Sequence, residues 1–182
     1  MAWPVLVFDI ETIPDMAGWR RLHGVPEGVA PDASDAELFA HWKAQRAEHG
    51  QSDFMPLYLQ RVLCISCVFR NAEGLRVHSF VDRDGASEAK VVQTFFNAIE
   101  KHSPQLVSWN GSGFDLPVLH YRGLQHGVVA DHYWDMGEGD REFKWNNYIG
   151  RYHLRHLDLM DLLAKYTPLC YLFGVGSEVD AS

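Results

Sequence analysis

Two acidic residues close the first apolar run of the chain. Asp9 and Glu11 follow residues 5–8, which are all apolar. Residues i and i+2 of a β-strand project from the same face, so the two carboxylates would point the same way and repel each other. Like charges are costly to bring together unless a cation lies between them, and Mg²⁺ and Mn²⁺ prefer oxygen ligands. The pair therefore predicts a divalent-metal site, and the alternative is an edge strand whose acids face water.

A third carboxylate follows another short apolar run. Asp115 comes after residues 105–109 and a turn with two glycines, which indicates a tight passage from strand to helix. Pro117 is tolerated in the first turn of that helix, so Asp115 is expected near a helix N-terminus, where a carboxylate is favoured. A purely structural interpretation makes Asp115 an N-cap, Asn110 a turn former and Phe114 a core residue.

The elements that position these acids follow from the hydrophobic pattern. Residues 5–13 predict a strand buried on both faces, because their apolar run lacks polar alternation before Asp9. Two more strands are expected over 61–69 and 75–81, joined by a hairpin turn at 71–74. A helix over 88–102 leads to a strand at 105–109, which should run parallel to the strand that it joins. A second helix ends near His126, and the predicted fold is α/β in the order βββαβα.

Residues 15–55 interrupt this pattern as an insertion. Ser34 and Glu37 form a capping box at the start of a helix that extends to about His49. Its apolar stripe predicts packing on the edge of the domain, and a mobile lid over the acids is the second interpretation.

The stretch 127–152 has little periodicity and many aromatic residues, with Arg and His at 151–156. Aromatic residues interleaved with cations suit base stacking and phosphate contact, although a long ordered surface loop has the same composition. Residues 157–166 are expected to form a short strand or loop that turns into a helix.

The bulk composition sets limits on the class of protein. A chain of 182 residues with 47% hydrophobic content forms one globular domain with a sizeable core. A net charge of −8 argues against a general electrostatic binder of nucleic acid, but it is compatible with an enzyme whose metal ions meet the phosphate. Neither a membrane-length apolar run nor a secretion signal is evident, so a cytoplasmic location and no membrane partner are expected. Cys64 and Cys67 are interpreted as reduced core cysteines.

The two acidic motifs together resemble the DEDD superfamily of 3′–5′ exonucleases. The chain is most similar to the stand-alone bacterial proteins that resemble the proofreading domain of family-B DNA polymerases. Asp9-Ile10-Glu11-Thr12 matches the motif D-x-E-T, and residues 110–115 match N-x₃-F-D. The resemblance covers about residues 4–166. It implies a ribonuclease-H-like mixed sheet with flanking helices over 1–166, interrupted by the insertion, and a divergent or truncated tail over 167–182.

The resemblance also implies a reaction, which is two-metal hydrolysis of a phosphodiester with Mg²⁺ or Mn²⁺. The substrate would be single-stranded nucleic acid, DNA in preference to RNA. By analogy Asp9 bridges both ions, Glu11 binds one and helps to position the attacking water, and Asp115 holds the second ion. The residues that would seat the terminal nucleotide are Ile10, Thr12, Asn110 and Phe114.

The sequence departs from the family at the fourth acid. The polymerase-like branch takes it from a Y-x₃-D motif on a last helix. No Y-x₃-D follows Asp115, so we expect that helix to be missing here. A sister branch uses H-x₄-D, and His156 with Asp161 has that spacing, although Asp161 could equally support the fold near a helix start. Weak or absent activity is therefore expected from this chain.

Two other functional classes remain open. The first is a catalytically degenerate exonuclease-like module that binds nucleic acid or a protein. The second is an endonuclease of the ribonuclease H or integrase type, which shares the fold. The sequence does not indicate an oligomeric state.

Overall fold

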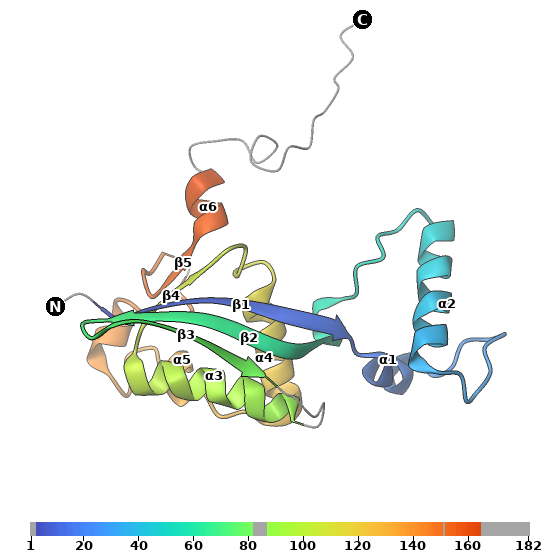
Figure 1. Ribbon diagram of the computed structural model, residues 1–182, viewed down its shortest axis with the longest axis horizontal. Coiled ribbons are helices and arrows are strands. Elements are labelled where there is room, and N and C mark those ends of the chain that lie inside the picture. The colour runs from blue at the N-terminus through green and yellow to red at the C-terminus, as the bar shows by residue number, and fades with distance from the viewer. Residues whose placement is uncertain (1–2, 82–86, 151, 165–182) are drawn as a thin grey trace, which may run out of the picture.

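A five-stranded mixed sheet carries Asp9 and Glu11 on its first strand (Figure 1). The computed structural model describes residues 3–81, 87–150 and 152–164. The sheet order is β3-β2-β1-β4-β5. β1 pairs antiparallel with β2 and parallel with β4, and β5 continues the parallel side. The strands are β1 (Val5–Pro14), β2 (Gln60–Asn71), β3 (Gly74–Val81), β4 (Gln105–Ser108) and β5 (His156–Asp158).

The helices confirm most of the predicted pattern. α3 and α4 contact β2 and each other on one face of the sheet, and α5 packs on α3. α1 and α2 belong to the insertion, and α6 follows β5. The bounds are α1 (Met16–His23), α2 (Asp35–Glu48), α3 (Glu88–His102), α4 (Asp115–His126), α5 (Asp131–Trp134) and α6 (Leu159–Ala164), with 3₁₀ turns η1 (Leu57–Leu59) and η2 (Arg141–Lys144). The α/β prediction is confirmed as a ribonuclease-H-like mixed sheet with flanking helices, and the predicted tail over 167–182 lies outside the described residues.

The prediction that β1 is buried on both faces is wrong. Leu6, Phe8 and Ile10 are buried in the main core, whereas Asp9 and Glu11 are exposed. In the parts of the chain that the structure describes, the helices cover one face of the sheet, and such one-sided cover is the usual reason for alternation along a strand. The alternation is hidden in the sequence because Val7, which is 40% exposed, is as apolar as its buried neighbours.

The uncovered face holds an apolar row beside the acids. The strand register places one residue of each strand side by side, and each of them shares the face of Asp9. We call this set the apolar row: Val77, Val68, Val7, Val107 and Leu157. Ser66 and Cys64 on β2 lie opposite Asp9 and Glu11 in the next two positions of that face.

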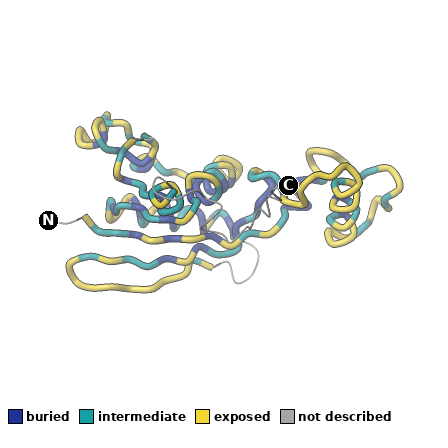
Figure 2. The backbone as a smooth tube through the Cα atoms, turned by 90° about the horizontal axis from the view of Figure 1, so that it is seen from above, coloured by how far each residue is buried: buried dark blue, intermediate teal, exposed yellow. Residues whose placement is uncertain are grey.

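The insertion has a small hydrophobic cluster of its own. Its buried residues are Met16, Trp19, Leu38, Trp42, Met55 and Leu59. The predicted capping box is present at the start of α2, where Ser34 and Glu37 bond to each other's backbone N–H. Seen from above, α1 and α2 extend beyond one end of the sheet (Figure 2). The apolar stripe of α2 is therefore buried within the insertion.

A buried ionic cluster joins the insertion to the helical layer. The Arg122 guanidinium of α4 donates to Glu88 of α3 and, at 2.7 Å, to Asp15, which caps α1. Glu88 also accepts the N–H of Val62 at 2.7 Å, and Asp15 accepts that of Gly18 at 2.8 Å. One arginine thus connects the end of β1, the start of β2 and both long helices of the core.

Two findings concern smaller predictions. Cys64 and Cys67 are free thiols. Cys67 is buried in the main core, where burial raises its pKa to about 12, whereas Cys64 is half-buried opposite Glu11, so the core prediction is wrong for Cys64. None of the helices within the described ranges has the length and apolar character needed to cross a membrane.

Candidate active site

Asp9 and Glu11 lie on the uncovered face of β1, as the period of a strand requires. The register with β2 shifts between Glu11 and Thr12, so the strand carries an irregularity directly after the second acid. Such bulges bend a strand and re-aim its side chains, and they are frequent beside active sites. The Thr12 hydroxyl donates to Oε1 of Gln60 at 3.0 Å, which ties the strand to the start of β2.

Asp115 is brought to the same strand from a distant part of the chain. It is the first residue of α4 and only 2% exposed, and its Oδ1 accepts the N–H of Ile10 at 3.1 Å. The interpretation of Asp115 as only a helix cap is therefore wrong, because its carboxylate bonds to β1, between the two acids. Burial and the Asp9 carboxylate raise the pKa of Asp115 to about 6, against the hydrogen bonds that it accepts.

The turn before Asp115 is held by an acid that the sequence analysis missed. Asp158, at the end of β5, accepts the N–H groups of Asn110 and Ser112 at 2.9 Å each and that of Met160 at 3.1 Å. Burial works to raise the pKa of Asp158, but these hydrogen bonds outweigh it and the pKa is lowered. A strand-end aspartate that bonds mainly to backbone N–H groups, with the Ser112 side chain as a further partner, has no pattern in the sequence that would reveal it.

The residues of this turn have the conformations that it demands. Asn110 adopts a positive φ of 58°, which asparagine tolerates better than most residues. A Cβ at Gly111 would lie 2.1 Å from the hydroxyl oxygen of Ser108, so only glycine fits there without a shift. The turn-former interpretation of Asn110 is thus confirmed.

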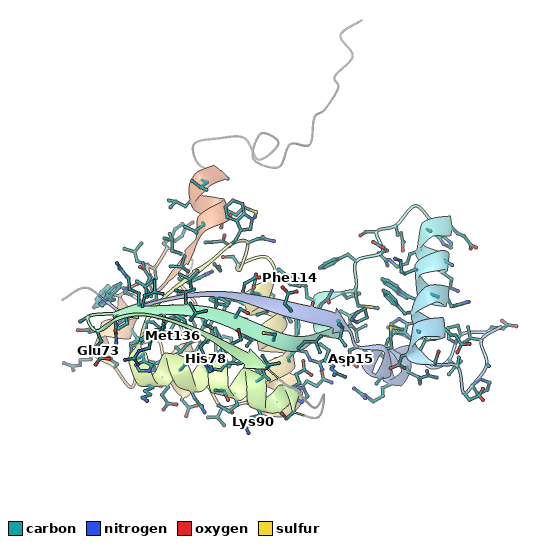
Figure 3. The ribbon with its side chains drawn as sticks, viewed as in Figure 1. Asp15, Glu73, His78, Lys90, Phe114 and Met136 are labelled. Carbon is teal, nitrogen blue, oxygen red and sulfur yellow. The ribbon has the colours of Figure 1, made fainter. Side chains whose placement is uncertain are left out.

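The residues predicted to seat a nucleotide are placed around these acids. Ile10 is buried and its N–H is already bonded to Asp115, so it cannot also donate to a substrate while that bond persists. Phe114 lies close to β1 (Figure 3) and packs partly on the main core. Its ring also meets Phe54 of the insertion, with centroids 5.7 Å apart.

His156 and Asp161 are not arranged around Asp9. His156 shares the register position of Leu106 and Leu6, so its side chain lies on the helix-covered face, opposite the acids. Its Nε2 lies 2.7 Å from the Ser108 hydroxyl oxygen, and burial lowers its pKa. Asp161 is exposed in the first turn of α6.

The stretch 127–152 is largely structural. Its rings Tyr133, Phe143 and Tyr148 are buried in the main core. The buried Arg155 guanidinium, which the sequence suggested for phosphate, stacks over Phe143 at 4.8 Å and donates to the Ser103 carbonyl at 3.0 Å. The nucleic-acid interpretation is wrong for these residues, because their side chains are buried in the protein. Their burial could not be predicted, since an irregular backbone gives no period in the sequence.

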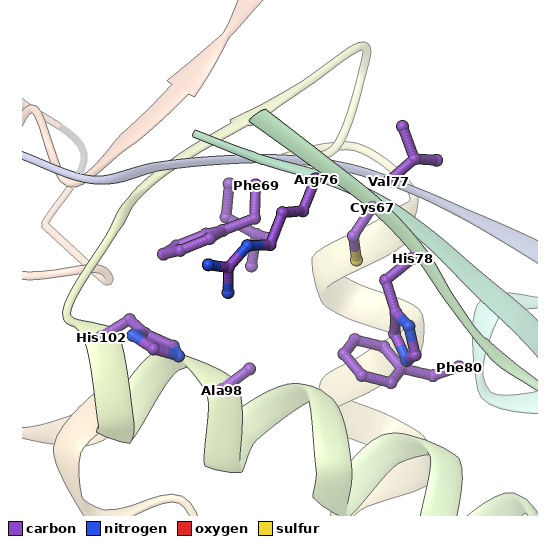
Figure 4. Close-up of a pocket in the computed structure, with 9 residues that line it drawn as sticks. Cys67, Phe69, Arg76, Val77, His78, Phe80, Ala98 and His102 are labelled. Carbon is purple, nitrogen blue, oxygen red and sulfur yellow. The ribbon is translucent and has the colours of Figure 1, made fainter. Parts of the chain in front are cut away.

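Two hollows flank the sheet. The larger, of about 910 Å³, borders the turn at Ser112 and Asp158 and is rimmed by Trp134 and Tyr152. The smaller, of about 300 Å³, lies between β3 and α3, on the face opposite the acids (Figure 4). Cys67, Phe69 and Phe80 point into it, whereas Val77 points away from α3.

The donor set suits a hard divalent cation. Asp9, Glu11 and Asp115 offer carboxylate oxygens only, which match Mg²⁺ or Mn²⁺ better than a softer metal. The raised pKa of Asp115 reflects burial and repulsion by Asp9, and a bound cation would relieve that repulsion. Over the described ranges, however, no three Asp, Glu, His or Cys side chains lie close enough together to form a ready-made metal site.

Comparison with known proteins identifies the family. The profile of the predicted 3′–5′ exonucleases related to the exonuclease domain of PolB matches residues 52–171. The chain belongs to this family. The match includes the turn and Asp115 but begins after Asp9 and Glu11. The assignment of the first motif is therefore based on the sequence of residues 9–12 and on their place in β1, and not on the family profile.

One solved structure that matches the chain in part is the family B DNA polymerase from the hyperthermophilic archaeon Pyrobaculum calidifontis. The TM-score is 0.47 at 17% identity, and the match covers 91% of this chain and 16% of the polymerase. The chain therefore spans less than a fifth of the length of that protein. No curated protein matches the chain in sequence.

Proposed function

We propose that the chain is a metal-dependent 3′–5′ exonuclease domain that acts on single-stranded nucleic acid, DNA in preference to RNA. The observation that carries the proposal is the hydrogen bond from the Ile10 N–H to Asp115. This bond brings a buried acid from the start of α4 to the stretch of β1 between Asp9 and Glu11. Membership in a family of predicted exonucleases supports the reaction class.

Each acid has a distinct part in the proposed site. Asp9 and Glu11 present their oxygens from the uncovered face, where a phosphodiester can approach. Asp115 adds a third carboxylate whose charge is set by its burial and by Asp9. Bound divalent ions would stabilise the attacking and leaving oxygens of an in-line displacement. Asp158 keeps the turn 110–114 in place through the bonds that it accepts from the backbone N–H groups of Asn110 and Ser112.

The family resemblance implies a fourth carboxylate for full turnover. Within the described residues, the Asp158 carboxylate already accepts hydrogen bonds from backbone N–H groups. Asp161 is exposed on α6, and His156, its partner in the H-x₄-D spacing, lies on the helix-covered face of the sheet. We therefore propose weak turnover with three acids. The second candidate function is a catalytically degenerate module that binds nucleic acid, and the lack of a ready-made metal cluster in these parts of the chain favours it.

Degradation of a 3′-labelled single-stranded oligonucleotide tests the proposal. With Mn²⁺ or Mg²⁺ we expect slow loss of label that Asp9→Ala and Asp115→Asn abolish. Binding without any metal-dependent loss would favour the degenerate module. A circular single strand resists an exonuclease, so its cleavage would show an endonuclease instead.

A further inference from the structure

The insertion places an aromatic ring against the second motif. Phe54 lies on the segment that returns from α2 to the sheet, and its ring is tilted by 60° against that of Phe114 at 5.7 Å. Phe114 directly precedes Asp115, so the pair lies next to the proposed site. Phe54 is 54% exposed, which leaves much of its ring open to solvent.

The backbone around Phe54 is held in place on both sides. Its own N–H donates to the Ser52 hydroxyl at 3.1 Å, and the next residue, Met55, is buried in the cluster of the insertion. The Met55 carbonyl accepts from the Gln60 amide at 2.9 Å. The same amide accepts from Thr12, so one side chain links the return segment to the strand of Asp9 and Glu11.

A fixed, half-exposed ring beside acidic groups suits a base better than a phosphate. Among the described residues, the cations that contact this segment are already engaged: Lys43 pairs with Asp53 at 2.8 Å, and the Arg46 guanidinium donates to the Ser52 carbonyl. Every nucleobase has a flat face, and stacking on aromatic side chains is tolerant of sequence. The base of a duplex is already stacked and paired, so it must leave its partner before it can lie against a protein ring.

We propose that Phe54 is a base-stacking residue which, with Phe114, selects an unpaired terminal nucleotide. This inference rests on the proposed function and deepens it, since it gives the site a preference for frayed, mismatched or single-stranded ends. Phe54 positions the substrate and takes no part in the chemistry. The preference comes from the base and depends little on the salt concentration, in contrast to phosphate contacts.

Binding measured without turnover separates this inference from the proposed reaction. A single-stranded oligonucleotide with 2-aminopurine at its 3′ end is titrated with protein in Ca²⁺. We expect Phe54→Ala to weaken binding on the order of tenfold and to reduce fluorescence quenching, and Phe54→Trp to retain both. Tyr58→Ala is the matched control, because Tyr58 lies on the same segment and is 44% exposed, but packs edge-on against Tyr121. It should bind as the wild type does.

An oligonucleotide with an abasic 3′ end distinguishes stacking from a general structural effect. Wild type and Phe54→Ala should bind it equally, because no base is present to stack. Equal losses on both oligonucleotides, or no loss on either, would overturn the inference. Phe54→Leu keeps an apolar contact to Phe114 but has no ring face. It replaces Phe54→Ala in the binding experiments if the alanine variant unfolds at a lower temperature than the wild type. Absence of hydrolysis with intact quenching would reject the exonuclease and leave the stacking role standing.

Discussion

The N–H of Ile10 donates a hydrogen bond to Oδ1 of Asp115, a residue 105 positions further along the chain. The donor lies between Asp9 and Glu11 on β1, and the acceptor opens α4. The parallel pairing of β1 with β4 makes this contact possible, because both strands deliver their C-terminal ends to the same edge of the sheet. Asp9 and Glu11 thereby share one region with an acid from a distant part of the chain, which makes the stability of this region depend on charge.

The first prediction concerns pH. The pKa of Asp115 is raised from 3.8 to about 6 by burial and by Asp9, so the folded protein holds this proton more tightly than the unfolded chain. The free energy of unfolding should therefore fall as pH rises between these values and stay lower above them, by on the order of 3 kcal/mol. Asp115→Asn should lack this component. Urea unfolding of both proteins from pH 4 to 8 measures it, and identical pH slopes would contradict the assignment.

The second prediction concerns the buried ionic cluster. Arg122→Met leaves Glu88 and Asp15 buried without their cation, so we expect a loss of about 3–5 kcal/mol in the free energy of unfolding. Arg76→Met is the matched control, because Arg76 pairs with Glu73 on the surface and both side chains are exposed. It should change stability by less than about 1 kcal/mol. Similar urea midpoints for the two variants would show that the cluster contributes little.

The third prediction concerns the turn before Asp115. Gly111→Ala would place a Cβ 2.1 Å from the Ser108 hydroxyl oxygen, so the turn must shift and stability should drop by about 1–3 kcal/mol. Gly123→Ala in α4 meets nothing closer than 3.8 Å and replaces a helix-interior glycine. That variant should be neutral or up to about 1 kcal/mol more stable. The melting temperatures of the two variants test this prediction. A lower melting temperature for Gly123→Ala with an unchanged one for Gly111→Ala would refute the packing argument.

The fourth prediction separates two neighbouring aspartates. Asp158→Asn converts one acceptor oxygen to a donor that faces a backbone N–H, so the turn loosens and Mn²⁺ binding at Asp115 should weaken. Asp161→Asn should change neither stability nor Mn²⁺ affinity, because His156, its partner in the H-x₄-D spacing, is bonded to Ser108 on the opposite face. Calorimetric titration with Mn²⁺ measures both. A clear loss for Asp161→Asn would make it the fourth ligand.

The spacing in the sequence predicted where Asp9, Glu11 and Asp115 lie in the fold, but it missed what supports them. Asp9, Glu11 and Asp115 were predictable because strand period and parallel topology determine where such residues meet. Asp158 was not, because its role depends on backbone groups that any sequence possesses. The one-sided burial of β1 was hidden by Val7, an apolar residue at an outward position. Phe143 and Tyr148 were expected to stack on bases or to lie on a surface loop, because the chain around them has no regular period, but both are buried in the main core.

The apolar row gives the acidic face an unusual thermodynamic character. Val7 adjoins Asp9 along β1, and the row from Val77 to Leu157 crosses all five strands beside the proposed metal ligands. A molecule that binds across this face would displace water from the apolar side chains of the row and from the carboxylates at the same time. Release of water from apolar surface lowers the heat capacity, whereas contacts of phosphate with metal alone do not carry that mark. A negative heat-capacity change would therefore accompany any binding that reaches beyond the acids onto the strands.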